Sequence, residues 1–68
     1  MHIFLGILMR DGSTQSFNIG NIEVIKDTPQ GAVIRCVSGN EYLTKETRQE
    51  ILDGLNSLFS QTSLIQKV

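Results

Sequence analysis

The sequence has few of the residues that build small catalytic or metal-binding sites. Its 68 residues include one cysteine (Cys36), one histidine (His2), one proline and no tryptophan. A single cysteine excludes an internal disulfide, and one cysteine with one histidine cannot complete a structural zinc site. We therefore expect neither a metal nor a cofactor.

The chain is also short. A single domain of this size buries only about 60% of the surface that its unfolded chain exposes, so its own core gives a thin stability margin. Small domains usually add disulfides, a metal or self-association. Because the composition excludes an internal disulfide and a zinc site, we expect the protein to be a homo-oligomer.

Charge of either sign is sparse. Lys and Arg total 6 against 7 Asp and Glu, which gives a formal net charge of −1. The cations form no run along the chain: Arg10, Lys26, Arg35, Lys45, Arg48 and Lys67. Proteins that bind nucleic acid chiefly through its phosphates are normally more basic. The composition thus argues against DNA or RNA binding, although a dimer could gather Arg10, Lys26, Arg35 and Lys67 on one basic face.

Long hydrophobic runs are absent as well. The opening "MHIFLGILMR" lacks the basic region and the cleavage site of a signal peptide. No stretch approaches the ~20 apolar residues of a membrane span. With one free thiol and no export signal, we expect a cytoplasmic protein without membrane insertion.

The first two thirds of the chain has the pattern of short β-strands. Apolar residues alternate over 3–9, and Asp11-Gly12 predicts a hairpin turn to a return strand over 14–19. Residues 22–26 fit either a strand from Ile22 or a helical turn, and we favour the strand. A turn at 27–31 then leads to strands at 32–37 and 41–43. The pattern predicts an antiparallel β-meander of four or five short strands.

The last third changes to a helical period. An amphipathic stripe is formed by Ile51, Leu52, Leu55, Leu58 and Phe59. Two starts compete: Thr44 as N-cap with Glu46 in the first turn, or a capping box from Thr47 to Glu50. We favour Thr44, because it leaves no gap after Leu43. The fold class is therefore α+β, with the meander and one C-terminal helix in a single domain over 1–60.

Residues 61–68 form a tail that could extend the helix, add a last strand or serve as an interface segment. Its apolar side chains would be hard to bury within so small a monomer. We therefore predict a protein interface made of Leu55, Leu58, Phe59, Leu64, Ile65 and Val68.

The candidate chemical groups all have structural explanations. Cys36 lies mid-strand among Ile34 and Val37, which is typical of an inert core thiol. His2 is expected at an exposed strand edge. Glu46, Glu50 and Asp53 share one helix face at i, i+4 and i+7, which favours a solvated polar face. We assign no catalytic residue and expect the protein not to be an enzyme.

The segment "RDGSTQSFNIGNIEVIKDTPQGAVIRCVSGNEYLTKET" resembles the small flagellar-operon FlbD/SwrD family. The likeness spans about residues 7–58. The matching positions are Gly12, Phe17, Ile22, Ile25, Thr28, Pro29, Val33, Ile34, Gly39, Tyr42, Lys45 and Glu46. The resemblance implies a small bacterial regulatory or adaptor protein that acts through protein–protein contacts.

A second segment, "GNEYLTKETRQEILDGLNSLF", resembles the strand-to-helix part of a LytTR-type DNA-binding domain. The Arg and His that follow the helix in that family have no counterpart in "FSQTSLIQKV", so its DNA contacts are not carried over. We keep a LytTR-like transcriptional regulator and a phage-type accessory or anti-defence protein as alternatives to the adaptor.

Overall fold

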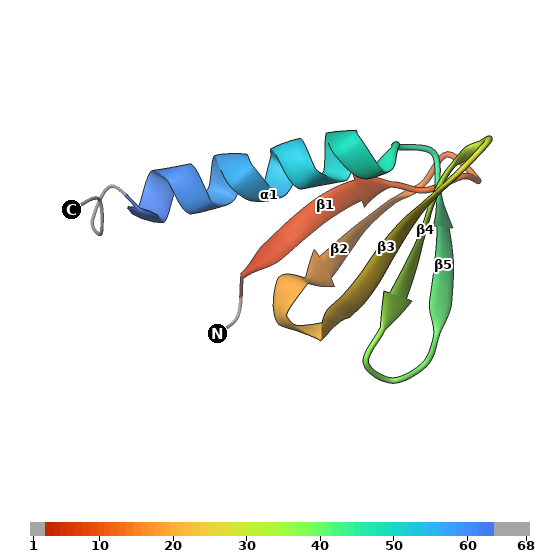
Figure 1. Ribbon diagram of the computed structural model, residues 1–68, viewed down its shortest axis with the longest axis horizontal. Helices are drawn as coiled ribbons and strands as arrows, with labels where there is room; N and C mark the ends of the chain where they lie inside the picture. Colours follow the sequence, from red (N-terminus) through yellow and green to blue (C-terminus); the bar gives the residue numbers. More distant parts are fainter. Residues whose placement is uncertain (1–2, 64–68) are drawn as a thin grey trace.

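A computed structural model describes residues 3–63 of the chain, with side chains through residue 59. Its strands are antiparallel, and a single α-helix follows them (Figure 1). The elements are β1 (Phe4–Leu8), β2 (Thr14–Asn18), the 3-10 turn η1 (Ile19–Asn21), β3 (Ile22–Thr28), β4 (Gly31–Cys36), β5 (Glu41–Thr44) and α1 (Arg48–Ser63). The predicted α+β meander with a C-terminal helix is confirmed.

The strands form two small sheets that meet at one corner. β1 pairs with β2, and β4 lies between β3 and β5. A bridge joins Met9 to Thr44, and the Lys45 N–H donates to the Leu8 carbonyl at 2.9 Å. From this corner β1 and β5 diverge, which leaves space for a core between the sheets (Figure 1).

Two hairpins use the same three-residue turn. The Met9 N–H donates to the Ser13 carbonyl (2.7 Å), and the Cys36 N–H donates to the Asn40 carbonyl (2.9 Å). The third loop residue is Gly12 in one turn and Gly39 in the other, with φ of 93° and 95°. Glycine adopts this left-handed backbone without steric cost, so the Asp-Gly and Ser-Gly pairs fix both turns.

Several strand boundaries differ from the expected ones. β3 continues to Thr28 and β4 begins at Gly31, so the expected turn at 27–31 is shorter than predicted, and β4 ends at Cys36 rather than at residue 37. β2 ends at Asn18 rather than Ile19, because the Asn18 Oδ1 accepts from the Gly20 N–H at 3.0 Å and starts η1. The ambiguous segment from Ile22 is a strand, as predicted, and pairs with β4 through a bulge between Ile22 and Val24.

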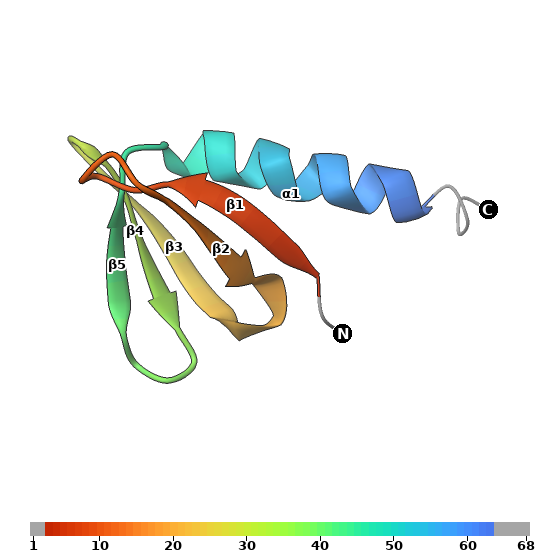
Figure 2. The ribbon, with the colours of Figure 1, turned by 180° about the vertical axis from the view of Figure 1, so that it is seen from behind.

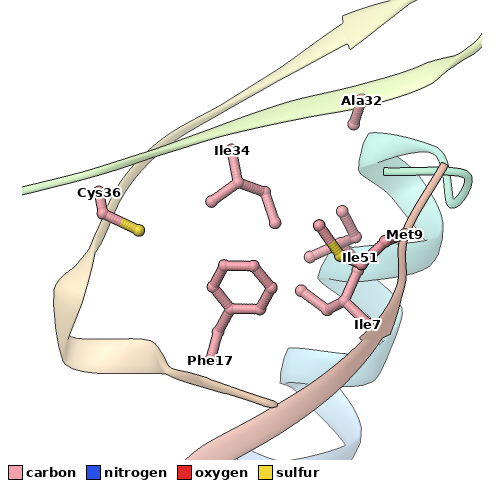
Figure 3. Close-up of a cluster of buried hydrophobic side chains, with 7 residues drawn as sticks. All are labelled: Ile7, Met9, Phe17, Ala32, Ile34, Cys36 and Ile51. Atoms are coloured by element: carbon pink, nitrogen blue, oxygen red, sulfur yellow. The ribbon is translucent and has the colours of Figure 1, made fainter. Parts of the chain in front are cut away.

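The core lies between β4 and the β1–β2 hairpin (Figure 3). Its buried members are Ile7, Met9, Phe17, Ala32, Ile34, Cys36 and Ile51. The Phe17 ring meets the Tyr42 ring edge to face, with 5.2 Å between centroids. Cys36 is buried in this cluster, as the strand pattern predicts.

The predicted helix start at Thr44 is wrong. α1 begins at Arg48, where the Thr47 N–H donates to Glu50 Oε1 (2.8 Å) and the Glu50 N–H donates to Thr47 Oγ1 (3.1 Å). Thr44 is fully buried in β5 and pairs with Ala32. Strand pairing therefore continues through Thr44, and the capping box three residues later starts the helix.

The helix covers the open side of the core and then continues past the strands. Ile51 is buried in the core, and Gly54 faces the Leu5 side chain of β1. Sixteen residues give α1 a length of about 24 Å. Its C-terminal part extends beyond the start of β1 in both views (Figures 1 and 2).

Candidate interaction surfaces

The apolar stripe of α1 divides at Leu55. Leu55 is half-buried and packs against the core, whereas Leu58 is half-buried outside the core cluster and Phe59 is 45% exposed. We call Leu55, Leu58 and Phe59 the distal apolar patch. The remaining members of the predicted interface, Leu64, Ile65 and Val68, lie outside the described residues, as does His2.

The distal apolar patch lies on a helix segment without charge. Leu55, Leu58 and Phe59 stand at i, i+3 and i+4, so they form one ridge along the helix. No charged residue occurs from Gly54 to Ser63. A contact made by this ridge would thus depend on apolar area and shape rather than on ion pairs.

The acidic residues that the sequence placed on one helix face are separated in the structure. Glu46 precedes α1, and its Oε2 accepts from the Leu8 N–H of β1 at 2.9 Å. Glu50 caps the helix, and Asp53 Oδ1 accepts from Gln49 Nε2 at 2.9 Å. Two of the three carboxylates therefore have structural hydrogen bonds to the backbone. The expected common face is wrong because the helix begins after Glu46.

No metal-binding group forms within the described part of the chain. There, no three His, Cys, Asp or Glu side chains lie close enough together to hold a metal ion. No helix within residues 3–63 is long and apolar enough to cross a membrane.

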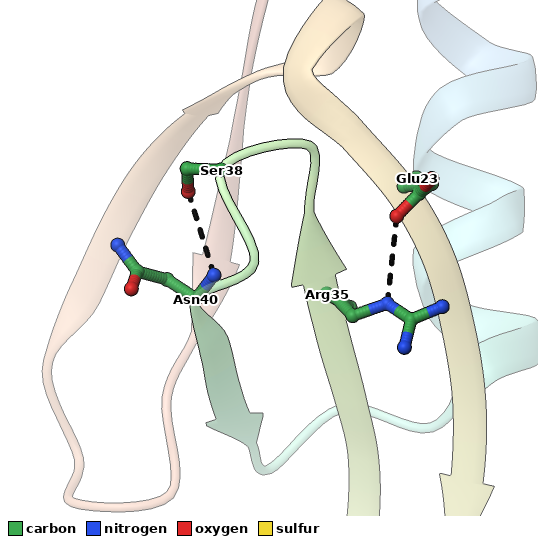
Figure 4. Close-up of polar contacts among 4 residues, drawn as sticks. All are labelled: Glu23, Arg35, Ser38 and Asn40. Atoms are coloured by element: carbon green, nitrogen blue, oxygen red, sulfur yellow. Dashed lines mark hydrogen bonds and ion pairs between the residues drawn. The ribbon is translucent and has the colours of Figure 1, made fainter.

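Two of the basic residues make contacts within the fold. The Arg10 guanidinium reaches from the β1–β2 turn to the other sheet, with Nε 3.3 Å from the Thr44 carbonyl and Nη2 3.2 Å from Thr28 Oγ1. Arg35 Nε lies 3.4 Å from Glu23 Oε1 on the exposed face of β3 and β4 (Figure 4). Lys67 lies outside the described residues.

One carboxylate has a shifted pKa. The Ser13 hydroxyl and N–H both donate to Asp11 Oδ1, at 2.6 and 2.9 Å, and these bonds lower the pKa of Asp11. Asp11 lies in the exposed β1–β2 turn. The lowered pKa of Asp11 therefore results from hydrogen bonds within the turn and does not mark a cluster of functional groups.

A groove that sequence reasoning missed runs along β2. It has a volume of about 450 Å³ and lies between β2 and the β4–β5 turn, and its apolar lining is Phe4, Phe17, Cys36, Val37 and Tyr42. Its polar lining is uncharged and consists of Gln15, Ser16, Asn18, Asn21 and Ser38. The one available signal was the absence of charge from Gly12 to Ile22.

Comparisons of the chain with protein-family models, with curated proteins and with solved structures found no match. The resemblances to the FlbD/SwrD and LytTR families therefore stay predictions. What the structure defines is a small α+β domain that has two distinct uncharged surfaces, the distal apolar patch and the groove along β2.

Proposed function

We propose that the protein is a non-enzymatic regulatory or adaptor protein, cytoplasmic and homo-oligomeric, that binds a partner protein through the distal apolar patch. The observation that carries this proposal is the extension of α1 past the sheets, with Phe59 45% exposed near its end. Beyond the core contact of Leu55, the helix places Leu58 and Phe59 outside the core cluster. Apolar ridges at i, i+3 and i+4 are the usual anchors of helix-in-groove recognition.

The positions of the candidate chemical groups support the non-enzymatic part of the proposal. The Glu46 and Glu50 carboxylates accept hydrogen bonds from backbone N–H groups. Cys36 is buried beside the groove along β2, whose described lining residues include no histidine and no carboxylate. A nucleophilic thiol needs an adjacent general base, and a general base must face a space that admits a substrate. The single unpaired thiol supports a cytoplasmic location.

Site-specific photo-crosslinking in the source cells would test the partner contact. A photoreactive phenylalanine analogue replaces Phe59, and in a matched control it replaces Leu43, which is 51% exposed on β5. We expect a discrete protein adduct from position 59 and none from position 43. Absence of an adduct at position 59 would contradict the proposal.

A second step tests the patch directly with the purified captured protein. Leu58→Ser with Phe59→Ser should weaken its binding by at least about tenfold, because both changes remove apolar contact area. Leu43→Ser removes a comparably exposed side chain and should leave the affinity unchanged. Equal affinities for the two variants would show that the patch does not bind the partner.

A further inference from the structure

The outer edge of β2 has unpaired backbone groups. The Met9 N–H donates to the Ser13 carbonyl, and the Ile19 N–H donates to the Ile3 carbonyl. Hydrogen-bonded residues alternate along an antiparallel pair, so the backbone N–H and C=O groups of Gln15 and Phe17 also point toward β1. The N–H and C=O groups of Thr14, Ser16 and Asn18 therefore point away from β1. We call these three residues the β2 edge, and no strand of the described chain pairs with it.

This edge lacks three of the usual protections against pairing. β2 reads Thr-Gln-Ser-Phe-Asn, and it contains no charge, no proline and no bulge. Natural edge strands normally have such features because a bare edge is a template for another strand. The opposite edge of the fold, β3, has Glu23, Lys26 and Asp27, a bulge, and α1 beside it. The contrast indicates that the β2 edge is covered in the working protein.

We propose that two copies of the protein pair through this edge, antiparallel about a two-fold axis at Ser16. In that register Ser16 faces Ser16 of the second copy, and Thr14 faces Asn18. Each of these pairs can exchange both backbone hydrogen bonds, because all of the outward groups belong to Thr14, Ser16 and Asn18. No like charges meet, since β2 has none. The strand is therefore self-complementary in hydrogen bonding and in charge.

Exposed apolar side chains flank the same edge. Phe4 and Val37 are 56% and 64% exposed, and both line the groove beside β2. A second copy on the β2 edge would place its own β2 and the equivalent groove against these residues. The pairing would therefore bury apolar area and would also give the backbone N–H and C=O groups of the β2 edge their hydrogen-bond partners. The groove lining is uncharged and so is β2, so a second copy presents to the groove a strand that matches it in charge.

This inference rests on the homo-oligomer in the proposed function and specifies how it forms. The distal apolar patch lies on a different element, α1, and stays available to the partner protein. The two proposals can fail separately: one concerns the mass of the purified chain, the other the binding of a second protein.

Charge complementation at Ser16 tests the pairing. Ser16 is exposed, so Ser16→Lys and Ser16→Glu are compatible with the folded monomer. Like charges directly across a two-fold axis destabilise a strand pair, and opposite charges stabilise it. Native mass spectrometry should show the wild type at twice 7.6 kDa and each variant with dimer affinity weakened at least about tenfold. A mixture of the two variants should give a heterodimer.

Two controls identify the interface. Gln30→Lys and Gln30→Glu make the same charge changes in the exposed turn between β3 and β4, and both should remain dimers. Leu58→Ser with Phe59→Ser should also remain a dimer. A monomeric wild type, Ser16 variants with wild-type affinity, or a mixture without heterodimer would each overturn the proposal.

Amide hydrogen exchange gives an independent readout. In the wild-type dimer the amides of Thr14, Ser16 and Asn18 should exchange slowly, and in Ser16→Lys they should exchange at least about tenfold faster. The amides of Gln15 and Phe17 bond to β1 and should stay protected in both proteins, which shows that the hairpin is intact. Fast exchange of the three edge amides in a wild-type dimer would place the contact elsewhere and overturn the proposal.

Discussion

The carbonyl oxygen of Thr44 lies so close to the place where a Cβ atom on Gly31 would stand that the two atoms would overlap. Gly31 opens β4 with φ of 142°, and the Lys45 carbonyl carbon lies 3.1 Å from the same position. Both obstacles are backbone atoms, so no change of rotamer relieves them. We expect Gly31→Ala to lower the free energy of unfolding by roughly 3 kcal/mol, from the positive φ and the overlap together.

Urea denaturation of Gly31→Ala beside Gly39→Ala measures this relationship. Gly39 has φ of 95°, but a Cβ there would meet no atom within 4 Å. Gly39→Ala should lower the free energy of unfolding only by the cost of a positive φ, about 1–2 kcal/mol. Equal losses in the two variants would mean that the Thr44 carbonyl does not set the requirement at Gly31.

The position of the helix cap gives a second prediction. Thr47→Ala removes the hydroxyl that accepts from the Glu50 N–H and should cost about 1 kcal/mol. Thr47→Ser keeps an oxygen in the same place and should retain most of the stability. Thermal unfolding followed by circular dichroism at 222 nm compares the two. A Thr47→Ala protein as stable as Thr47→Ser would show that the helix does not depend on this box.

The contact between Gly54 and Leu5 predicts a coupling between helix and sheet. A Cβ at Gly54 would lie 3.3 Å from Leu5 Cδ1, which is close enough to crowd that atom. The crowded atom belongs to a side chain and not to the backbone. Gly54→Ala should gain helix propensity of about 1 kcal/mol and lose part of that gain to the crowding. In a Leu5→Ala background the crowding is absent, so the full gain should appear.

A double-mutant cycle in urea measures the difference between these gains. Leu5 is half-buried, so its side chain has room to relieve part of the crowding, and we expect a coupling of about 0.5 kcal/mol. Additive effects of the two substitutions would indicate that α1 does not approach β1 as closely as the structure has it.

The β1–β2 turn gives a pH prediction. The pKa of Asp11 is lowered in the folded state because the Ser13 hydroxyl and N–H donate to its carboxylate. A lowered pKa stabilises the fold above the unfolded pKa of the group, and this contribution is lost as pH falls through the folded pKa. Ser13→Ala should raise the pKa of Asp11, and Ser13→Thr should leave it low.

Titration of the Asp11 carboxyl carbon by NMR reads this pKa directly. The stability difference between wild type and Ser13→Ala should shrink as pH falls below the unfolded pKa, because the carboxylate that distinguishes them becomes protonated. An unchanged Asp11 titration in Ser13→Ala would show that the hydroxyl bond is not the main cause of the shift.

Local sequence determined most of the secondary structure. Period-two alternation around Ile7, Phe17 and Ile34 marks strands with one buried face, and glycines at Gly12 and Gly39 mark turns that need positive φ. These features depend on residues close together in the chain. They can therefore be recognised before any long-range contact is known.

Tertiary structure decided what each polar backbone group pairs with. Threonine is a common helix N-cap, but Thr44 pairs with Ala32 and stays in β5, so the helix begins at Arg48. The spacing of Glu46 from Glu50 and Asp53 predicts one solvated helix face, yet the Glu46 carboxylate accepts a hydrogen bond from the Leu8 N–H, 38 positions away. The open β2 edge likewise appears only once the sheet order is known. Hydrogen bonds between distant strands compete with local capping and turn signals, and the sequence pattern does not contain the outcome of that competition.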